Sequence, residues 1–213
     1  MKHILGPVLG FRSSTATAWN CCVLHVFDEL QGAAPALKWK QGGTAKTTPG
    51  KSIYTHGTAQ VWVYEIPARL LAAESSVSYE LADGTGKAIY NVPKKSATPR
   101  MAYCSCNGFS DPKLARDLVN PVNRWEHLKA THEAQPAQPF HLLLMGGDQV
   151  YSDQMWANVP ALAEWANKSR FFQTRSGFTA PMDTDVRQFF FDLYTVNWEI
   201  GRASCRERVC LAV

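Results

Sequence analysis

The sequence contains the stretch Phe140-His-Leu-Leu-Leu-Met-Gly-Gly-Asp-Gln-Val-Tyr-Ser-Asp153, an apolar run that changes abruptly into a polar loop. Such a run predicts a strand that is covered on both faces, as in a parallel sheet. Arg100–Cys106 is a second short apolar strand. Helices are expected over 112–119, 122–133 and 154–167. The order strand, helices, strand, helix predicts a βαβα unit in which the two strands are parallel neighbours.

Residues 1–98 show the pattern of an antiparallel β fold. Thr15–Phe27 is rich in β-forming residues, and alternating residues over Gln60–Ile66 give a period of two. Further short strands are expected over Ile53–His56, Ser76–Leu81 and Ala88–Val92. The expected fold class is α+β overall. Residues 1–98 form an N-terminal antiparallel β-sandwich of fibronectin-III or immunoglobulin type, and residues 99–198 form the first βαβα part of a truncated α/β domain.

The last fifteen residues, 199–213, form a segment that we interpret as artefactual. Glu199-Ile-Gly-Arg-Ala-Ser-Cys-Arg-Glu-Arg-Val209 has the sequence that a common sequencing-adapter oligonucleotide gives on translation. The preceding segment, 183–198, has a helical pattern with an apolar face and no stop signal. We therefore exclude 199–213 from the fold prediction, as a fusion scar would be excluded, and expect the natural protein to continue past Trp198.

Composition limits the classes of function. Hydrophobic residues make up 46% of the chain and charged residues 19%, which is typical of a globular protein. The net charge of +4 is spread along the chain, which does not favour nucleic-acid binding. No apolar run is long enough to span a membrane, and the N-terminus lacks the features of a signal peptide, so we expect a cytoplasmic protein. Six cysteines are too few for a disulfide scaffold.

The ends of the two parallel strands carry residues that can bind a metal. Ligand-binding residues follow the carboxyl ends of such strands, here Cys106 after one strand, and Asp148 and Tyr151 after the other. A thiolate and a carboxylate are common ligands, whereas a phenolate needs a strong Lewis acid such as ferric iron. The alternatives are that Asp148 caps a helix, that Tyr151 packs, and that Cys106 is a small buried hydrophobe.

Other reactive side chains have simpler explanations. His141 lies within an apolar strand and is expected to be a core histidine, whereas His127 and His132 are expected on a solvated surface. Asp153 fits a further metal-binding carboxylate or the acidic start of a helix equally well. Cys21 and Cys22, adjacent on one strand, are expected to pack on opposite faces.

Together, Tyr103-Cys-Ser-Cys-Asn-Gly108 and the Gly-Asp-x-x-Tyr motif of residues 147–151 resemble the PhoD-like (alkaline phosphatase D) branch of the metallophosphatases. That family also places a small β-sandwich before its metallophosphatase domain, and Ile4–Phe11 resembles the start of that sandwich. The resemblance covers residues from about 3 to 198.

The resemblance implies a metal-dependent phosphoester hydrolase, of phosphodiesterase or alkaline phosphatase D type. Cys106, Asp148 and Tyr151 would bind Fe³⁺, and Asp148 would bridge to Ca²⁺ or another divalent metal. A metal-bound hydroxide would then attack a phosphoester substrate. The family's later ligands, including an Asp-Asp-His stretch, have no match in 154–198. We therefore expect this chain to lack a complete two-metal site and to be inactive.

Two alternatives remain. In the first, Cys106 is the nucleophile of a thiol enzyme, with a histidine such as His141 as its base. In the second, residues 1–98 act as a non-enzymatic binding module. The sequence shows no sign of a membrane, nucleic-acid or protein partner.

Overall fold

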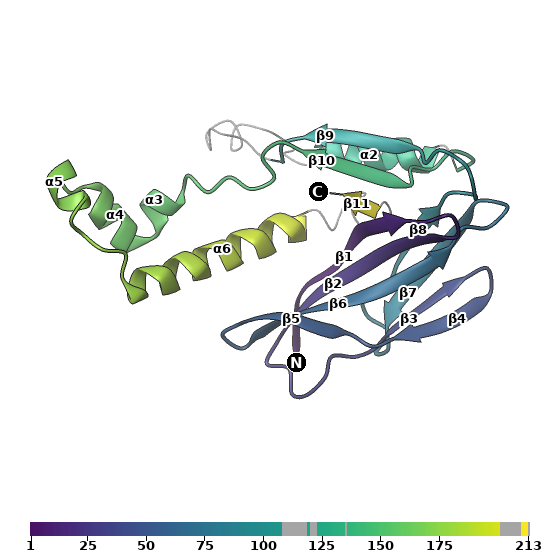
Figure 1. Cartoon of the computed structure of the whole chain (residues 1–213), viewed down its shortest axis with the longest axis horizontal. Helices are drawn as coiled ribbons and strands as arrows, with labels where there is room; N and C mark the ends of the chain where they lie inside the picture. The colour runs from purple at the N-terminus through teal and green to yellow at the C-terminus, as the bar shows by residue number, and fades with distance from the viewer. Residues whose placement is uncertain (108–118, 120–122, 135, 201–209, 213) are drawn as a thin grey trace.

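The structure, a computed structural model, describes residues 1–107, 119, 123–134, 136–200 and 210–212. Two sheets occupy one side of the molecule, and a group of short helices lies at the opposite end (Figure 1). The strands are β1 (Lys2–Ser14), β2 (Ala18–Asp28), β3 (Leu37–Gln41), β4 (Thr44–Thr48), β5 (Lys51–His56), β6 (Ala59–Arg69), β7 (Ser75–Leu81), β8 (Ala88–Val92), β9 (Met101–Ser105), β10 (Leu142–Gly146) and β11 (Cys210–Ala212). The helices within the described ranges are α2 (Asn123–Ala134), α3 (Met155–Asn158), α4 (Pro160–Ala166), α5 (Arg170–Gln173) and α6 (Ala180–Ile200).

The larger sheet has the strand order β5-β6-β2-β1-β11-β10-β9, and the smaller sheet has the order β4-β3-β7-β8. β5, β6, β2 and β1 pair antiparallel, whereas β9, β10 and β11 pair parallel. The short strand β11 also pairs parallel with β1. One mixed sheet thus links the antiparallel region 1–98 to the parallel strands that carry the candidate site.

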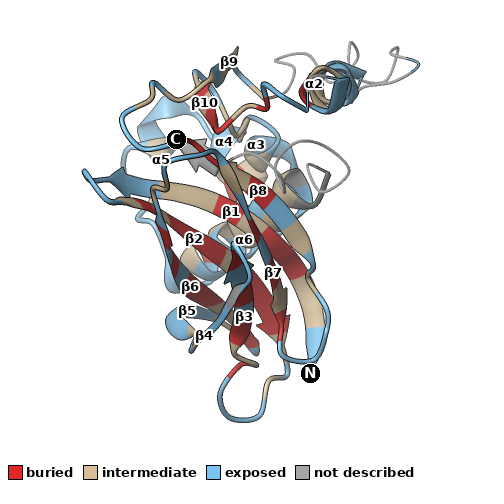
Figure 2. Ribbon diagram, turned by 90° about the vertical axis from the view of Figure 1, so that its right-hand side faces the viewer, coloured by how far each residue is buried: buried red, intermediate tan, exposed pale blue. Residues whose placement is uncertain are grey.

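The main core lies between the facing sides of the two sheets. Trp19 and Tyr64 of the larger sheet belong to the same buried cluster as Trp39 and Tyr90 of the smaller sheet. Figure 2 shows this buried interior along the strands of both sheets. The period-two pattern of β6 is confirmed here, because Trp62, Tyr64 and Ile66 all join this cluster.

The opposite face of the larger sheet is also apolar, because α6 packs on it. Phe191 and Trp198 of α6 contact a buried cluster formed by Leu5, Val26 and Ala59. The helix leaves a cavity of about 410 Å³ between itself and the sheet. This cover explains why β1 and β2 are apolar on both faces although they lie in antiparallel pairs.

Several sequence-based boundaries need correction. The β3–β4 hairpin was not predicted, although Leu37, Trp39 and Gln41 alternate with two exposed lysines in the period expected of a strand. The single helix expected over 154–167 is divided into α3 and α4. Pro160, which lacks an amide hydrogen, begins α4, and Val159 before it is extended (φ −98°, ψ 106°).

Two predictions meet the limits of the described residues. The helix expected over 112–119 lies outside them, apart from Val119. The segment 199–213, interpreted above as artefactual, contributes β11 to the larger sheet. The sequence pattern did not predict this strand, and the artefactual origin of the segment stays a prediction. Within the described ranges, none of the helices has the length and apolar character to cross a membrane.

Candidate metal centre

The two strand ends that carry Cys106 and Asp148 lie side by side. β9 and β10 are paired in parallel along their whole length. Two backbone hydrogen bonds continue beyond the strands: the Cys106 N–H donates to the Gly146 carbonyl at 2.8 Å, and the Asn107 N–H donates to the Asp148 carbonyl at 2.8 Å. The loops after β9 and β10 therefore meet at one edge of the sheet, as the parallel arrangement predicts.

The backbone of both loops turns sharply at this edge. Cys106 has a φ of 65° and Gly147 a φ of 69°, which is the left-handed region that favours glycine. A Cβ atom on Gly147 would lie 2.7 Å from the Ser105 hydroxyl and 2.8 Å from the Cys106 sulfur. Glycine at position 147 is therefore required both by the backbone conformation and by the close approach of the two loops.

The Cys106 sulfur collects hydrogen bonds from both loops. The backbone N–H of Asp148, the Ser105 hydroxyl (3.7 Å) and the Tyr151 hydroxyl all contact it. These bonds, that of Asp148 first, lower the pKa of the Cys106 thiol, because each of them stabilises the thiolate. The pKa of Tyr151 is raised, first by its hydrogen bond to Cys106 and then by desolvation.

The three predicted ligands form one cluster that solvent can reach. Cys106 and Asp148 are exposed and Tyr151 is half-buried. Asp148 acts on both Cys106 and Tyr151 through its charge, and Asp153 acts on Tyr151 in the same way. Ser105 was not predicted as part of the site, although its hydroxyl, next to the cysteine, is the kind of neighbour that stabilises a thiolate.

The donor set suits a metal ion, but it is small. Cys106, Asp148 and Tyr151 belong to the two loops that Gly147 allows to approach each other closely. Across the ranges that the structure describes, no three His, Cys, Asp or Glu side chains form a group able to hold a metal. A metal site at this edge would therefore need Tyr151 as a ligand in addition to Cys106 and Asp148.

His141 lies at the other end of the strands and is a core histidine, as expected. Its side chain is 1% exposed, and its Nδ1 accepts the Arg100 backbone N–H at 3.0 Å. Burial, followed by the charge of Arg100, lowers the pKa of His141 to about 4. Because His141 precedes β10 and Cys106 follows β9, roughly 15 Å of strand separates them. His141 therefore cannot serve as the base of a Cys106 thiol enzyme.

The expected surface position of His132 is wrong. Its side chain is 6% exposed, and its Nδ1 accepts the backbone N–H of Phe140 at 3.1 Å. The Phe140 ring also stacks on it at 6.0 Å between centroids. The polar composition of α2 hid this contact, since the histidine faces the chain that enters β10. His127 is exposed and Cys21 and Cys22 are buried, as expected.

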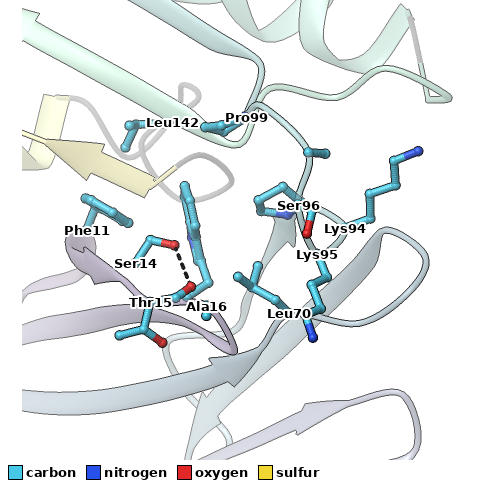
Figure 3. Close-up of a pocket in the computed structure, with 13 residues that line it drawn as sticks. Phe11, Ser14, Thr15, Ala16, Leu70, Lys94, Lys95, Ser96, Pro99 and Leu142 are labelled. Carbon is cyan, nitrogen blue, oxygen red and sulfur yellow. Dashed lines mark hydrogen bonds between the residues drawn. The ribbon is translucent and has the colours of Figure 1, made fainter.

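A hollow of about 390 Å³ lies where the larger sheet meets the segment between β8 and β9 (Figure 3). Phe11, Leu70, Pro99 and Leu142 form apolar parts of its wall. Figure 3 shows Lys94 extending away from the hollow. None of the predicted metal ligands lines it, so it is separate from the candidate centre.

Comparison with known proteins places the site in a family. The sequence profile described as "PhoD related phosphatase" matches residues 90–209, which include Cys106, Asp148 and Tyr151. The chain belongs to the PhoD-related phosphatase family. The resemblance inferred from the strand-end motifs is thereby confirmed. The match to this phosphatase family also extends into the segment 199–213, which we interpret as artefactual.

Two further proteins are similar to this PhoD-related chain. An uncharacterised protein of Saccharomyces cerevisiae is 30% identical over 144 residues, which cover 65% of the chain and 19% of the yeast protein. The chain thus spans about a fifth of the length of the curated relative that it matches. A purple acid phosphatase from yellow lupin (Lupinus luteus) seeds aligns with a TM-score of 0.47 at 13% identity, over 96% of this chain and 34% of the lupin chain.

Proposed function

We propose that the protein from which this chain derives is a metal-dependent phosphoester hydrolase whose first metal is held by Cys106, Asp148 and Tyr151. Membership of the PhoD-related phosphatase family supports the class of reaction. The single observation that supports the site is the junction of the loops after β9 and β10, which are far apart in the sequence but are joined by two backbone hydrogen bonds of 2.8 Å at Cys106 and Asp148.

That junction suits a cation, because the Cys106 sulfur and the Tyr151 oxygen come from the two loops that meet there. The Asp148 carboxylate is near both atoms and supplies a negative charge. Phenolate and thiolate together favour Fe³⁺, and we propose Ca²⁺ as the second metal, with Asp148 as the bridging ligand. Metal bound here would act as a Lewis acid on a phosphoryl oxygen.

We further propose that this chain alone does not turn over substrate. The cluster offers three protein ligands, and the described residues contain no other group of metal-binding side chains. A two-metal site needs additional ligands, and the yeast relative is about five times as long as the matched region. Incubation with Fe³⁺, Ca²⁺ and bis-p-nitrophenyl phosphate should therefore release no nitrophenol above the rate of the buffer.

Residues 1–98 are proposed to be a β-sandwich domain that supports residues 99–198. The core shared by the two sheets supports this proposal. Its larger sheet continues into β10 and β9 through β11, so the two regions share a scaffold. An independent binding role for residues 1–98 remains a separate hypothesis, and a specific partner of the isolated region would support it.

Ferric titration tests the metal site directly. Wild-type chain should develop a tyrosinate-to-iron absorption band on addition of Fe³⁺, and a chelator should remove it. Tyr151→Phe should abolish the band, because it removes the phenol oxygen and little else. Tyr194→Phe, at a partly exposed tyrosine of α6 far along the chain from the strand ends, is the matched control and should keep the band. An equal band in Tyr151→Phe would rule out this ligand set.

A further inference from the structure

Gln149 lies between two of the proposed ligands, and its side chain folds back onto the preceding turn. Its Nε2 donates to the Gly146 carbonyl at 2.6 Å. The same carbonyl accepts the Cys106 backbone N–H at 2.8 Å. One oxygen atom thus connects the end of β10, the loop that follows it and the loop after β9.

The other end of the Gln149 amide is unusual. Its Oε1 is buried and has no hydrogen-bond donor among the residues that the structure describes. The amide cannot simply be flipped, because Oε1 would then face the Gly146 carbonyl oxygen, and two acceptors repel each other. A buried acceptor without a donor lowers stability, and an apolar side chain of similar length would avoid that cost. Global stability therefore does not explain why an amide occupies this position.

Local geometry explains the amide better. The hydrogen bond to Gly146 closes the turn that contains Gly147 and Asp148. Within that turn, the Asp148 carbonyl must face the Asn107 N–H, to which it is bonded at 2.8 Å. Any change in the turn would move Asp148 relative to the loop after β9.

We propose that Gln149 is a positioning residue for the metal centre: its Nε2–Gly146 hydrogen bond holds the turn that places Asp148 beside Cys106. The role of Gln149 in metal binding rests on the proposed function. Gln149 acts through Gly146 and Asp148 and is not itself a ligand.

Gln149→Met provides the test, because methionine has a similar length and no hydrogen-bonding amide. In this variant, the Fe³⁺ dissociation constant, read from the tyrosinate band, should rise about tenfold, as is typical when a residue supporting a ligand is lost. The Asn107 amide should exchange its hydrogen about five- to tenfold faster, since the turn is no longer closed. The urea unfolding midpoint should stay the same or rise, because the unpaired buried oxygen is removed. A purely structural hydrogen bond would instead lower the midpoint.

Gln154→Met is the matched control, since Gln154 is exposed and its side chain forms no capping hydrogen bond. It should leave iron affinity and Asn107 exchange unchanged. Unchanged Asn107 exchange in Gln149→Met would overturn the proposal, as would faster exchange throughout β1 and β2 with a lower midpoint. If wild-type chain shows no iron band, the proposed function fails, while Asn107 exchange still decides whether Gln149 sets the turn.

Discussion

The burial of His141 makes a quantitative prediction about stability at acid pH. The ring is 1% exposed, and the folded chain lowers its pKa from 6.5 to about 4. Because the folded state disfavours protonation of His141, the contribution of the neutral ring to the free energy of unfolding is fully present above pH 6.5. It is lost as the pH falls from 6.5 toward 4. The pKa of His141 is lowered because burial and the charge of the Arg100 guanidinium disfavour the protonated ring. These two effects outweigh the attraction of Glu74.

The size of this effect on stability follows from the shift in the pKa of His141. A difference of 2.5 pKa units corresponds to at most about 3 kcal/mol, of which about 2 kcal/mol should be lost by pH 5. His141→Asn removes the titrating ring but keeps an acceptor near the position of Nδ1, which receives the Arg100 N–H. The variant should therefore be less stable than wild type at pH 7.5 but lose less stability on acidification.

Urea unfolding at pH 7.5, 6 and 5, followed by tryptophan fluorescence, measures this difference. The buried His132 and all surface carboxylates are present in both proteins, so their contributions cancel in the comparison. His127→Asn, an exposed histidine in α2, is the matched control and should retain the wild-type pH dependence. Parallel pH profiles for wild type and His141→Asn would refute the reasoning.

Two further substitutions test the arrangement around the strand ends. Gly147→Ala should destabilise the chain by about 1–2 kcal/mol because of the left-handed backbone alone. The clash of its Cβ with the Cys106 sulfur should also weaken iron binding. Gly177→Ala, whose Cβ would meet nothing within 4 Å, is the control and should show neither effect in the same urea and iron titrations. Arg100→Met removes a two-oxygen ion pair with Glu74 at 2.6 and 2.7 Å, so it should cost about 1 kcal/mol because both side chains are about a third exposed. It should also raise the pKa of His141 toward its ordinary value, as NMR titration of the ring would show; an unchanged or lower value would contradict the electrostatic account.

The neighbouring position of the two strand ends was predictable from the sequence, whereas the metal-binding role of their residues stays a prediction. An apolar run followed directly by Gly-Gly-Asp identifies the end of a covered strand, and that signal is local. Two such ends, at Cys106 and at Asp148, were expected to be neighbours because a βαβα order favours parallel pairing. The structure brings them together through two backbone hydrogen bonds between the loops.

Other features were beyond prediction because they depend on contacts between distant segments. The burial of His132 results from its bond to the Phe140 backbone, and α2 itself is too polar to reveal it. Strand β11 joins the sheet by pairing with β1 and β10, which the amino-acid pattern of 210–212 did not indicate. The fold-back of Gln149 depends on the turn at Gly147, because only that turn brings its amide within reach of Gly146.

The sequence by itself determined which residues follow the strands and what chemistry they carry, because hydrophobic runs, glycines and polar side chains act over a few neighbouring positions. Only the tertiary structure decided that backbone hydrogen bonds join the loops of Cys106 and Asp148 and that Gly147 lets the two loops approach closely. These contacts require two strands to pair in one register, and that register is fixed by packing and hydrogen bonding across segments that are far apart in the chain.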